Sequence, residues 1–311
     1  MFDKAWVDTG RFRIVYANDF CKDVLETYRY NIGNVIECKD IRDVEARELP
    51  FADVFSTSPC CQAYSTANRH NIDSAEGEEK RRLVEEVVRL VRERKPKVCV
   101  IENVPGMLSM EDGIHLSKVI EGLPEYDVTA CVVKDHEVGG YSTRERAIII
   151  ASRIGRIELP TLKVMNPKTV RDALSKVNAE WYNYSDITVP NEETKKKMSF
   201  VPQGGNWKDI PPEYNSYKAK THSNVMRRLA WDEPSITMSN FRKSNILHPE
   251  KDRILSVAEA AAIMGLDKTF RFISKSLSAK QQMVANGVTK AIGSVVSRTV
   301  LHALDAAPAL G

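Results

Sequence analysis

The sequence has few cysteines, and they follow no metal-binding or disulfide pattern. None of the six forms a C-x-x-C pair: they are Cys21, Cys38, Cys60, Cys61, Cys99 and Cys131. Without such spacing, neither a disulfide framework nor a zinc site is expected, and we assign no metal. Most of these thiols are expected to stay reduced and to pack as small apolar side chains.

Long apolar runs are also missing from the 311 residues. No stretch approaches the roughly 18 residues that a membrane span needs, and no signal-peptide pattern follows Met1. A charged fraction of 28% with 42% hydrophobic residues excludes a largely disordered chain. We therefore expect a soluble protein of the cytoplasm with no membrane partner.

The net charge of +3 hides an uneven distribution. Residues 1–150 carry 21 Lys and Arg against 27 Asp and Glu, whereas residues 151–311 carry 24 against 15. A basic half on a nearly neutral chain indicates a polyanionic partner such as a nucleic acid. A solvated basic surface without a partner explains the same numbers, so charge alone leaves both interpretations open.

Strand-like and helix-like segments alternate in the first half of the chain. Runs rich in apolar and β-branched residues at 13–19, 52–58, 98–103 and 147–152 predict strands. The segment 80–95, KRRLVEEVVRLVRERK, has apolar residues at helical spacing. This alternation predicts an α/β fold with a doubly wound, mostly parallel sheet, in which ligands bind at the carboxyl ends of the strands.

The pattern changes after residue 155. Prolines and glycines cluster between residues 202 and 212, among scattered tryptophans and basic residues. A final helix-like stretch runs from about Ala279 to Leu304. We predict a first domain made of residues 1–170 and 278–311, and a smaller irregular domain made of residues 171–277.

Reactive side chains follow two of the predicted strands. TSPCCQAYS (57–65) places cysteines on a turn at Pro59, and IENVPG (101–106) ends the next buried strand with Glu102. A thiol at this edge can be a nucleophile if its pKa is lowered, although a strand-end cysteine is more often structural. A nucleophilic thiol beside a carboxylic acid suits conjugate addition to a ring that is protonated as it is attacked.

Two arginines enter the strand predicted at 147–152. Arg144 and Arg146 lie on one face of TRERAIIIAS (143–152). An ordinary salt-bridged strand edge would account for them as well.

These segments, in this order, resemble the DNA cytosine-5 methyltransferases. The family's P-C-Q motif matches Cys61-Gln62, its E-N-V motif matches Glu102-Asn103-Val104, and its R-x-R motif matches Arg144 and Arg146. Three further segments are similar to the family's sequence around its target-recognition region: PQGGNWKDIP (202–211), RLAWDEPSITM (228–238) and HPEKDRILSVAEAAAIMGL (248–266). The resemblance extends over nearly the whole chain and implies a Rossmann-like fold that binds S-adenosyl-L-methionine.

The resemblance implies a covalent mechanism on a cytosine that has left the stack of duplex DNA. Cys61 would add to carbon 6, and Glu102 would hold the amino group and N3 while carbon 5 accepts the methyl group. Arg144 and Arg146 would grip the base oxygen and the flanking backbone. The region 171–277 would recognise the DNA sequence.

Further residues are implied for the cofactor site. Asp19, at the end of the strand predicted at 13–19, is placed to bind ribose hydroxyls, as acidic residues do in nucleotide-binding sheets. Phe20 could stack on adenine, and Asp40-Ile41 resembles the family's contact at the exocyclic amine, although Asp40 could be a plain turn residue. The implied cofactor site also includes Pro59, Asn286 and Val288.

The chain departs from the family pattern at four places. Cys60 replaces a second proline, Ser142 replaces a glutamine, and the final G-N-x-V-P motif reads ANGVT (285–289), which keeps only Asn286 and Val288. A glycine-rich cofactor loop normally precedes the ribose-binding acid by roughly 20 residues, and none precedes Asp19. The loop and its strand would then lie upstream of Met1, come from a complementing N-terminal polypeptide, or have been lost.

We therefore predict a monomeric DNA cytosine-5 methyltransferase, a restriction-modification partner or an orphan enzyme, associated with the nucleoid in a prokaryote. One alternative is a catalytically impaired or split-enzyme descendant that binds DNA, favoured by the missing loop and the departures. Another is a tRNA cytosine methyltransferase on the same fold. The long basic recognition region favours duplex DNA over tRNA, and retention of the motif residues favours catalysis.

Overall fold

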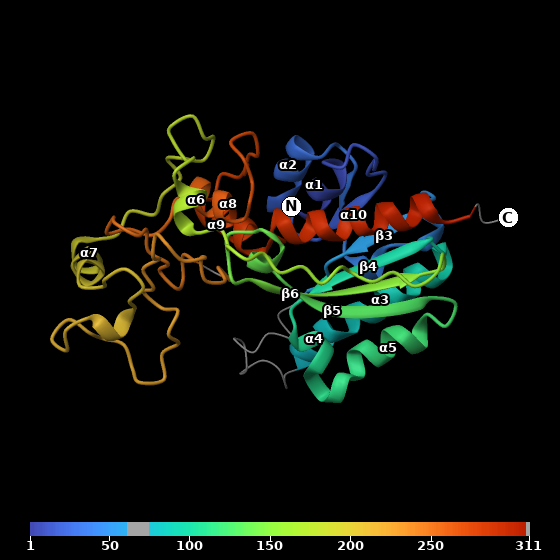
Figure 1. Cartoon of the computed structure of the whole chain (residues 1–311), viewed down its shortest axis with the longest axis horizontal. Helices are drawn as coiled ribbons and strands as arrows, with labels where there is room; N and C mark the ends of the chain where they lie inside the picture. The colour runs from blue at the N-terminus through green and yellow to red at the C-terminus, as the bar shows by residue number, and fades with distance from the viewer. Residues whose placement is uncertain (61–74, 240, 309–311) are drawn as a thin grey trace.

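The protein has two lobes of different construction, seen side by side in Figure 1. The computed structural model describes residues 1–60, 75–239 and 241–308. One lobe contains the sheet and the helices packed on it, and the other contains short helices joined by long irregular segments. No helix among these residues is long and apolar enough to cross a membrane.

The described elements follow the predicted alternation in the first half. The strands are β1 (Ala17–Asp19), β2 (Ile36–Cys38), β3 (Val54–Thr57), β4 (Val98–Asn103), β5 (Asp127–Lys134) and β6 (Glu145–Ser152). The α-helices are α1 (Phe2–Val7), α2 (Lys22–Asn31), α3 (Ala75–Arg94), α4 (Gly106–Ser109), α5 (Ile114–Gly122), α6 (Val170–Leu174), α7 (Glu192–Ser199), α8 (Val257–Ile263), α9 (Leu277–Asn286) and α10 (Lys290–Ala306).

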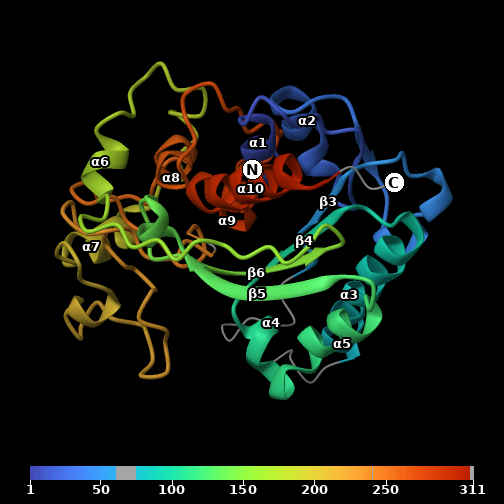
Figure 2. The ribbon, with the colours of Figure 1, turned by 45° about the vertical axis from the view of Figure 1, so that its right-hand side comes forward.

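Alternate residues of the central strands supply two separate apolar cores. Cys99 and Ile101 of β4 pack with α3 and α5 on one face of the sheet, and Val98 and Val100 pack with α1 and α10 on the other. Figure 2 shows these helices below and above the sheet. Since successive side chains of a strand point to opposite faces, a strand that is apolar throughout requires cover on both sides. The predicted doubly wound α/β fold is confirmed.

The sheet is divided into two parts. Strands β3, β4, β6 and β5 form one sheet in that order, with β3 and β4 parallel and β6 antiparallel to both of its neighbours. Strands β1 and β2 form a separate parallel pair. Among the described residues, no strand pairing connects the two parts.

Two predicted boundaries were wrong. The strand predicted at 13–19 is regular only over β1, and the closing helix is two helices, α9 and α10, separated by Gly287, Val288 and Thr289. Thr289 is the N-cap of α10, with extended backbone. The interruption coincides with the segment that resembles the family's final motif, so the chain turns where the resemblance implies cofactor contacts.

The second lobe has its own apolar core. It includes Val170, Trp181, Trp207, Phe241 and the buried face of α8, and it extends to Ala285 in α9. This core runs from the predicted domain boundary near residue 171 to slightly beyond the predicted end at residue 277. We call residues 171–277 the recognition lobe.

Arg228 ties three segments of the recognition lobe together. Its guanidinium donates to the backbone carbonyls of Val201 (2.7 Å), Met198 (2.7 Å), His248 (2.9 Å) and Lys251 (3.0 Å). It also pairs with Asp252 at 2.6 Å. Because Arg228 is only 4% exposed, these bonds replace water at a buried charge and fix the loops around it.

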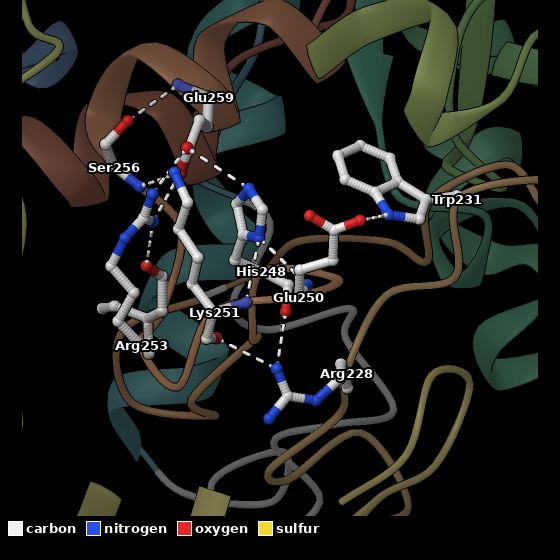
Figure 3. Close-up of polar contacts among 9 residues, drawn as sticks. Arg228, Trp231, His248, Glu250, Lys251, Arg253, Ser256 and Glu259 are labelled. Carbon is white, nitrogen blue, oxygen red and sulfur yellow. Dashed lines mark hydrogen bonds and ion pairs between the residues drawn. The ribbon is translucent and has the colours of Figure 1, made fainter. Parts of the chain in front are cut away.

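His248 and Glu259 join the turn at 248–253 to helix α8, as Figure 3 shows. Nδ1 of His248 accepts from the backbone amides of Glu250 (3.1 Å) and Lys251 (3.2 Å), which leaves the proton on Nε2, 3.7 Å from Glu259. Glu259 also receives two bonds from Arg253, of 2.7 and 2.8 Å. Burial lowers the pKa of His248 to about 4, so the ring is neutral near pH 7.

A short extended segment, residues 271–273, docks the recognition lobe on the sheet lobe. Asn31 of α2 accepts from the amide of Arg271 and donates to its carbonyl, and Thr27 pairs with the amide and carbonyl of Ile273 in the same way. From the recognition lobe, Asn183 holds both backbone groups of Phe272. Side chains thus supply the hydrogen-bond partners that neighbouring strands would give to the backbone of a segment in a sheet. We call 271–273 the docking segment.

Candidate active site

The loop that carries the expected nucleophile starts beside the end of β4. Cys61 itself lies outside the described residues, but Pro59 and Cys60 are described. Nδ2 of Asn103 donates to the carbonyl oxygen of Pro59 at 3.1 Å, and Oδ1 of Asn103 accepts from the amide of Val104. Asn103 is 1% exposed. This buried amide therefore fixes the start of the cysteine loop next to Glu102.

Glu102 and Arg146 form a buried ion pair at the same edge. Nε of Arg146 lies 2.7 Å from Oε1 of Glu102, and the two residues are 8% and 6% exposed. Strands β4 and β6 are paired so that Glu102 lies opposite Ile148, which brings the two side chains together. A carboxylate held by one directional, charge-assisted bond keeps its second oxygen for another partner. The fold thus brings two of the predicted site residues into direct contact.

Arg144 is placed differently from the prediction. It is 1% exposed, and its guanidinium donates to the carbonyls of Ala285 (2.9 Å), Gly287 (2.8 Å) and Met238 (3.4 Å). The side chain therefore reaches into the protein, where it joins β6 to the segment after α9 and to the recognition lobe. This buried position does not support the expected contact of Arg144 with the DNA backbone.

Asp19 and Phe20 stand at the carboxyl end of β1. Oδ1 of Asp19 accepts from the amide of Cys21 at 2.8 Å, and burial raises the pKa of the Asp19 carboxyl. Phe20 is 73% exposed, an unusual position for a phenylalanine ring. A carboxylate that can accept ribose hydroxyls beside an open aromatic face fits an adenosine group.

Asp40 and Ile41 follow β2. Asp40 caps the 3₁₀-helix Ile41–Asp43 and accepts from the amide of Arg42 at 3.0 Å and from its guanidinium at 3.0 and 2.7 Å. These hydrogen bonds from Arg42 hold the pKa of the Asp40 carboxyl below its usual range. Ile41 packs between two apolar clusters. Asp40 thus caps a turn. To bind the amine of a cofactor, its carboxylate would have to accept from the amine and Arg42 together, or release Arg42.

The segment between α9 and α10 contributes two predicted residues that differ in exposure. Asn286 is exposed and accepts from Nε2 of Gln282 at 2.6 Å. Val288 is 4% exposed and packs in the core with Phe2 and Ile292. The Val288 side chain is therefore a core residue, whereas Asn286 is open to a ligand.

Three buried polar residues that hold loops in place were not predicted from the sequence. Asp135, Arg228 and His248 are each 5% exposed or less. Arg228 and His248 lie in segments that were matched to the family, but no spacing rule distinguishes an internal arginine from a DNA-binding one. Asp135 precedes a Gly-Gly pair, a signal of a tight turn around a polar side chain.

The fold and the site together define a class of enzyme. A doubly wound α/β lobe, an acid and an open ring after β1, and a cysteine loop held beside a buried carboxylate are the arrangement of a methyltransferase that uses S-adenosylmethionine.

Comparisons with known proteins identify the family. The C-5 cytosine-specific DNA methylase family matches residues 2–301. The Type II methyltransferase M.Eco47II of Escherichia coli is 30% identical over 332 residues, covering 96% of this chain and 76% of that protein. M.FnuDI of Fusobacterium nucleatum is 25% identical and covers 94% of this chain and 89% of its own length.

Solved structures show the same fold. A candidate DNA modification methyltransferase from an E. coli prophage superimposes with a TM-score of 0.74 at 17% identity, covering 98% of this chain and 95% of that one. The Dnmt2 methyltransferase of S. pombe gives a TM-score of 0.60 at 16% identity, covering 98% and 95%. The chain belongs to the C-5 cytosine-specific DNA methylase family. It transfers a methyl group from S-adenosylmethionine to carbon 5 of cytosine in DNA.

Proposed function

We propose that this chain methylates cytosine within a specific duplex sequence as a modification enzyme, with Cys61 as nucleophile and Glu102 and Arg146 as its catalytic partners. The observation that carries this assignment is the bond from Asn103 to the carbonyl of Pro59, two residues before Cys61, on the strand that also carries Glu102 of the Glu102–Arg146 pair. The Type II methyltransferases among its relatives support a role in restriction-modification.

The chemistry follows from these groups. The Cys61 thiolate forms a bond to carbon 6 of a flipped-out cytosine, and the ring electrons move toward carbon 5. Glu102 binds the amino group and N3, which stabilises the ring as it gains electron density. S-adenosylmethionine supplies the methyl group. Loss of the proton from carbon 5 then restores the ring and expels the Cys61 thiolate.

Arg146 has a positioning and a binding role in this scheme. Its bond to Oε1 of Glu102 orients the carboxylate, and the rest of its guanidinium can meet the oxygen of the base. Because both side chains are nearly buried, the pair is strengthened by the low polarity around it. Arg146 is therefore the arginine of the R-x-R motif that we assign to the target base.

For the cofactor we propose Asp19 at the ribose hydroxyls, Phe20 against adenine and Asn286 at the other side of the site. Asp40, Ile41, Pro59 and Val288 would border the site, with Ile41 and Val288 acting through the core that shapes it. Substituting Phe20→Ala would remove the stacking surface without disturbing a buried contact, since this ring is exposed.

We propose that residues 171–277 dock on DNA, with a monomer acting at nucleoid DNA in the cytoplasm. Exposed lysines of the recognition lobe support this docking: Lys195, Lys196, Lys208, Lys218 and Lys220. Binding should weaken steeply with salt, because each neutralised phosphate contributes about −0.9 to the slope of log K against log salt. A salt-independent affinity would contradict DNA docking by this lobe.

The covalent step has a direct test. A duplex containing 5-fluorocytosine at candidate target sites should trap a covalent complex that peptide mapping assigns to Cys61, because fluorine at carbon 5 blocks the final proton loss. Cys61→Ser should abolish trapping, whereas the matched variant Cys60→Ser should retain it. An adduct on Cys60 would contradict the assignment of Cys61 as the nucleophile.

A further inference from the structure

A buried carboxylate lies at the centre of the turn that joins β5 to β6. Asp135 is 0% exposed, and its Oδ2 accepts from both the amide (3.0 Å) and the hydroxyl (2.7 Å) of Ser142. Its own amide donates to the carbonyl of Arg144, and its carbonyl accepts from Gly140. The whole turn is therefore wrapped around one side chain that no catalytic step uses.

Two glycines make room for this carboxylate. A Cβ at Gly140 would lie 2.0 Å from Oδ1 of Asp135, a distance that no real contact allows. Gly139 has a φ of +89°, in the left-handed region that other residues rarely adopt. Gly140 thus leaves the space that the Asp135 side chain fills, and Gly139 supplies the left-handed backbone conformation of the turn.

Two of the departures from the family pattern meet at Asp135. Ser142, which stands where the family has glutamine, binds it directly. Thr289, which stands where the family has proline, is 1% exposed and faces the same carboxyl. Burial raises the pKa of Asp135, and Thr289, Ser142 and the charge of Arg144 act in the opposite direction. Two residues that are 147 positions apart in the chain thus both act to lower the pKa of one carboxyl.

Arg144 links this turn to two other parts of the molecule. From β6 it reaches the carbonyls of Ala285 and Gly287, on either side of Asn286, and the carbonyl of Met238 in the recognition lobe. The guanidinium of Arg144 can keep these three carbonyls in place only if Arg144 itself is held in place. Asp135 fixes the backbone at this residue, because its amide donates to the carbonyl of Arg144 at 2.8 Å and its carboxylate holds Ser142, two residues earlier.

We propose that Asp135, with Ser142, is a positioning residue for methyl transfer: it fixes the backbone from which Arg144 projects, so that the segment 285–289 is clamped between β6 and the recognition lobe. The residue acts through Arg144 and touches no reacting atom. This inference rests on the proposed assignment of Asn286 to the cofactor site.

The test uses the full chain with two independent readouts. Asp135→Asn removes the charge but keeps the size, and Gly140→Ala displaces the carboxylate without altering any charge. Asp127→Asn, at the exposed start of β5, is the matched control. Hydrogen exchange is followed in peptides covering 284–292, and S-adenosylmethionine affinity is measured by calorimetry below the thermal transition of each variant.

We expect both Asp135→Asn and Gly140→Ala to accelerate exchange at 285–289 by at least tenfold and to weaken cofactor binding by about the same factor. Asp127→Asn should match the parent in both measurements. Ser142→Ala combined with Asp135→Asn should be no worse than Asp135→Asn alone, since both act on one bond.

Unchanged exchange at 285–289 in both variants would overturn the positioning role. So would variants that melt earlier but bind the cofactor with parental affinity while folded, because a purely structural carboxylate would do only that. If exchange accelerates and the parent chain binds no cofactor, the clamp stands and the proposed cofactor assignment of Asn286 fails.

Discussion

The two lobes are stabilised in different ways. The sheet lobe rests on strands whose alternate residues enter two apolar cores, as in β4, where all six positions are buried. The recognition lobe has an apolar core too, but its long segments are joined by buried charged and polar side chains such as Arg228 and Glu259. Periodic apolar burial tolerates change at one position, whereas a buried charge depends on every partner it has.

The comparison predicts that polar substitutions in the two lobes fail for different reasons. In the sheet lobe they should affect chemistry, and in the recognition lobe they should affect folding and DNA binding. Four variants separate the two outcomes.

The largest effect is expected for Glu102→Gln in the sheet lobe. The amide can still accept from Arg146 but cannot stabilise the protonated ring, so single-turnover methyl transfer should fall about 100- to 10,000-fold. The thermal midpoint should stay close to the parent's. A loss of less than tenfold, or a loss explained by unfolding, would contradict a catalytic role for Glu102.

Arg228→Met should be the most damaging change to the recognition lobe. It leaves Asp252 and four backbone carbonyls without their buried donor, which costs about 3–5 kcal/mol of unfolding free energy. Arg227→Met, at the half-buried neighbouring position, is the control and should cost far less. Denaturant unfolding measures the loss of unfolding free energy in both variants. Equal losses would show that Arg228 has no special role in joining the segments of this lobe.

His248 should make the stability of the recognition lobe depend on pH. The pKa of His248 is about 4 in the folded chain and near 6.5 in the unfolded chain. Between these pH values, the unfolded chain binds a proton at His248 and the folded chain does not. The contribution is complete above pH 6.5 and declines as the pH falls to 4, by at most about 3 kcal/mol.

His248→Asn isolates this effect, because the Asn oxygen can accept from the amides of Glu250 and Lys251 but does not titrate in this range. Thermal unfolding at pH 7.5 and pH 5 should show a smaller drop for the variant than for the parent. An identical drop in both proteins would mean that other groups cause the acid sensitivity.

The smallest effect is expected for Lys268→Ala. The pair with Glu180 has a distance of 2.9 Å, but both side chains are more than half exposed, at 59% and 68%. Water and salt screen such pairs, so the thermal midpoint should not change measurably. A clear loss of stability would show that polar contacts of the recognition lobe matter even at its surface.

The part of the fold that could be predicted is the part where the pattern of apolar residues specifies a strand or helix. Strand β4 was predicted to the residue and β6 within two residues, because a continuous apolar run leaves few other structures. The sequence does not specify strand direction, so the antiparallel place of β6 between β4 and β5 was not predicted. The closing helix was predicted without its interruption, since Val288 continues an apolar pattern through the turn.

The candidate site was predictable where neighbouring strand ends bring residues together. Glu102 and Arg146, both named from the motifs, lie in contact, whereas Arg144, two residues away, reaches into the protein. Motif spacing identifies which residues share a strand face, but the partner of a buried arginine depends on segments more than 90 positions distant. Asp135 was missed for the same reason, because its partners are defined only by the folded turn.

The docking segment has a consequence for how such enzymes diversify. Thr27, Asn31 and Asn183 bind only the amides and carbonyls of residues 271–273, which every amino acid except proline presents alike. The polar part of the joint therefore depends on the course of the main chain, while the guanidinium of Arg271 adds contacts with the rings of Tyr30 and Tyr182, at 4.5 and 4.7 Å. Many residues of the recognition lobe can therefore change without loss of these main-chain bonds, provided that Thr27 and Asn31 of the sheet lobe and Asn183 of the recognition lobe are kept.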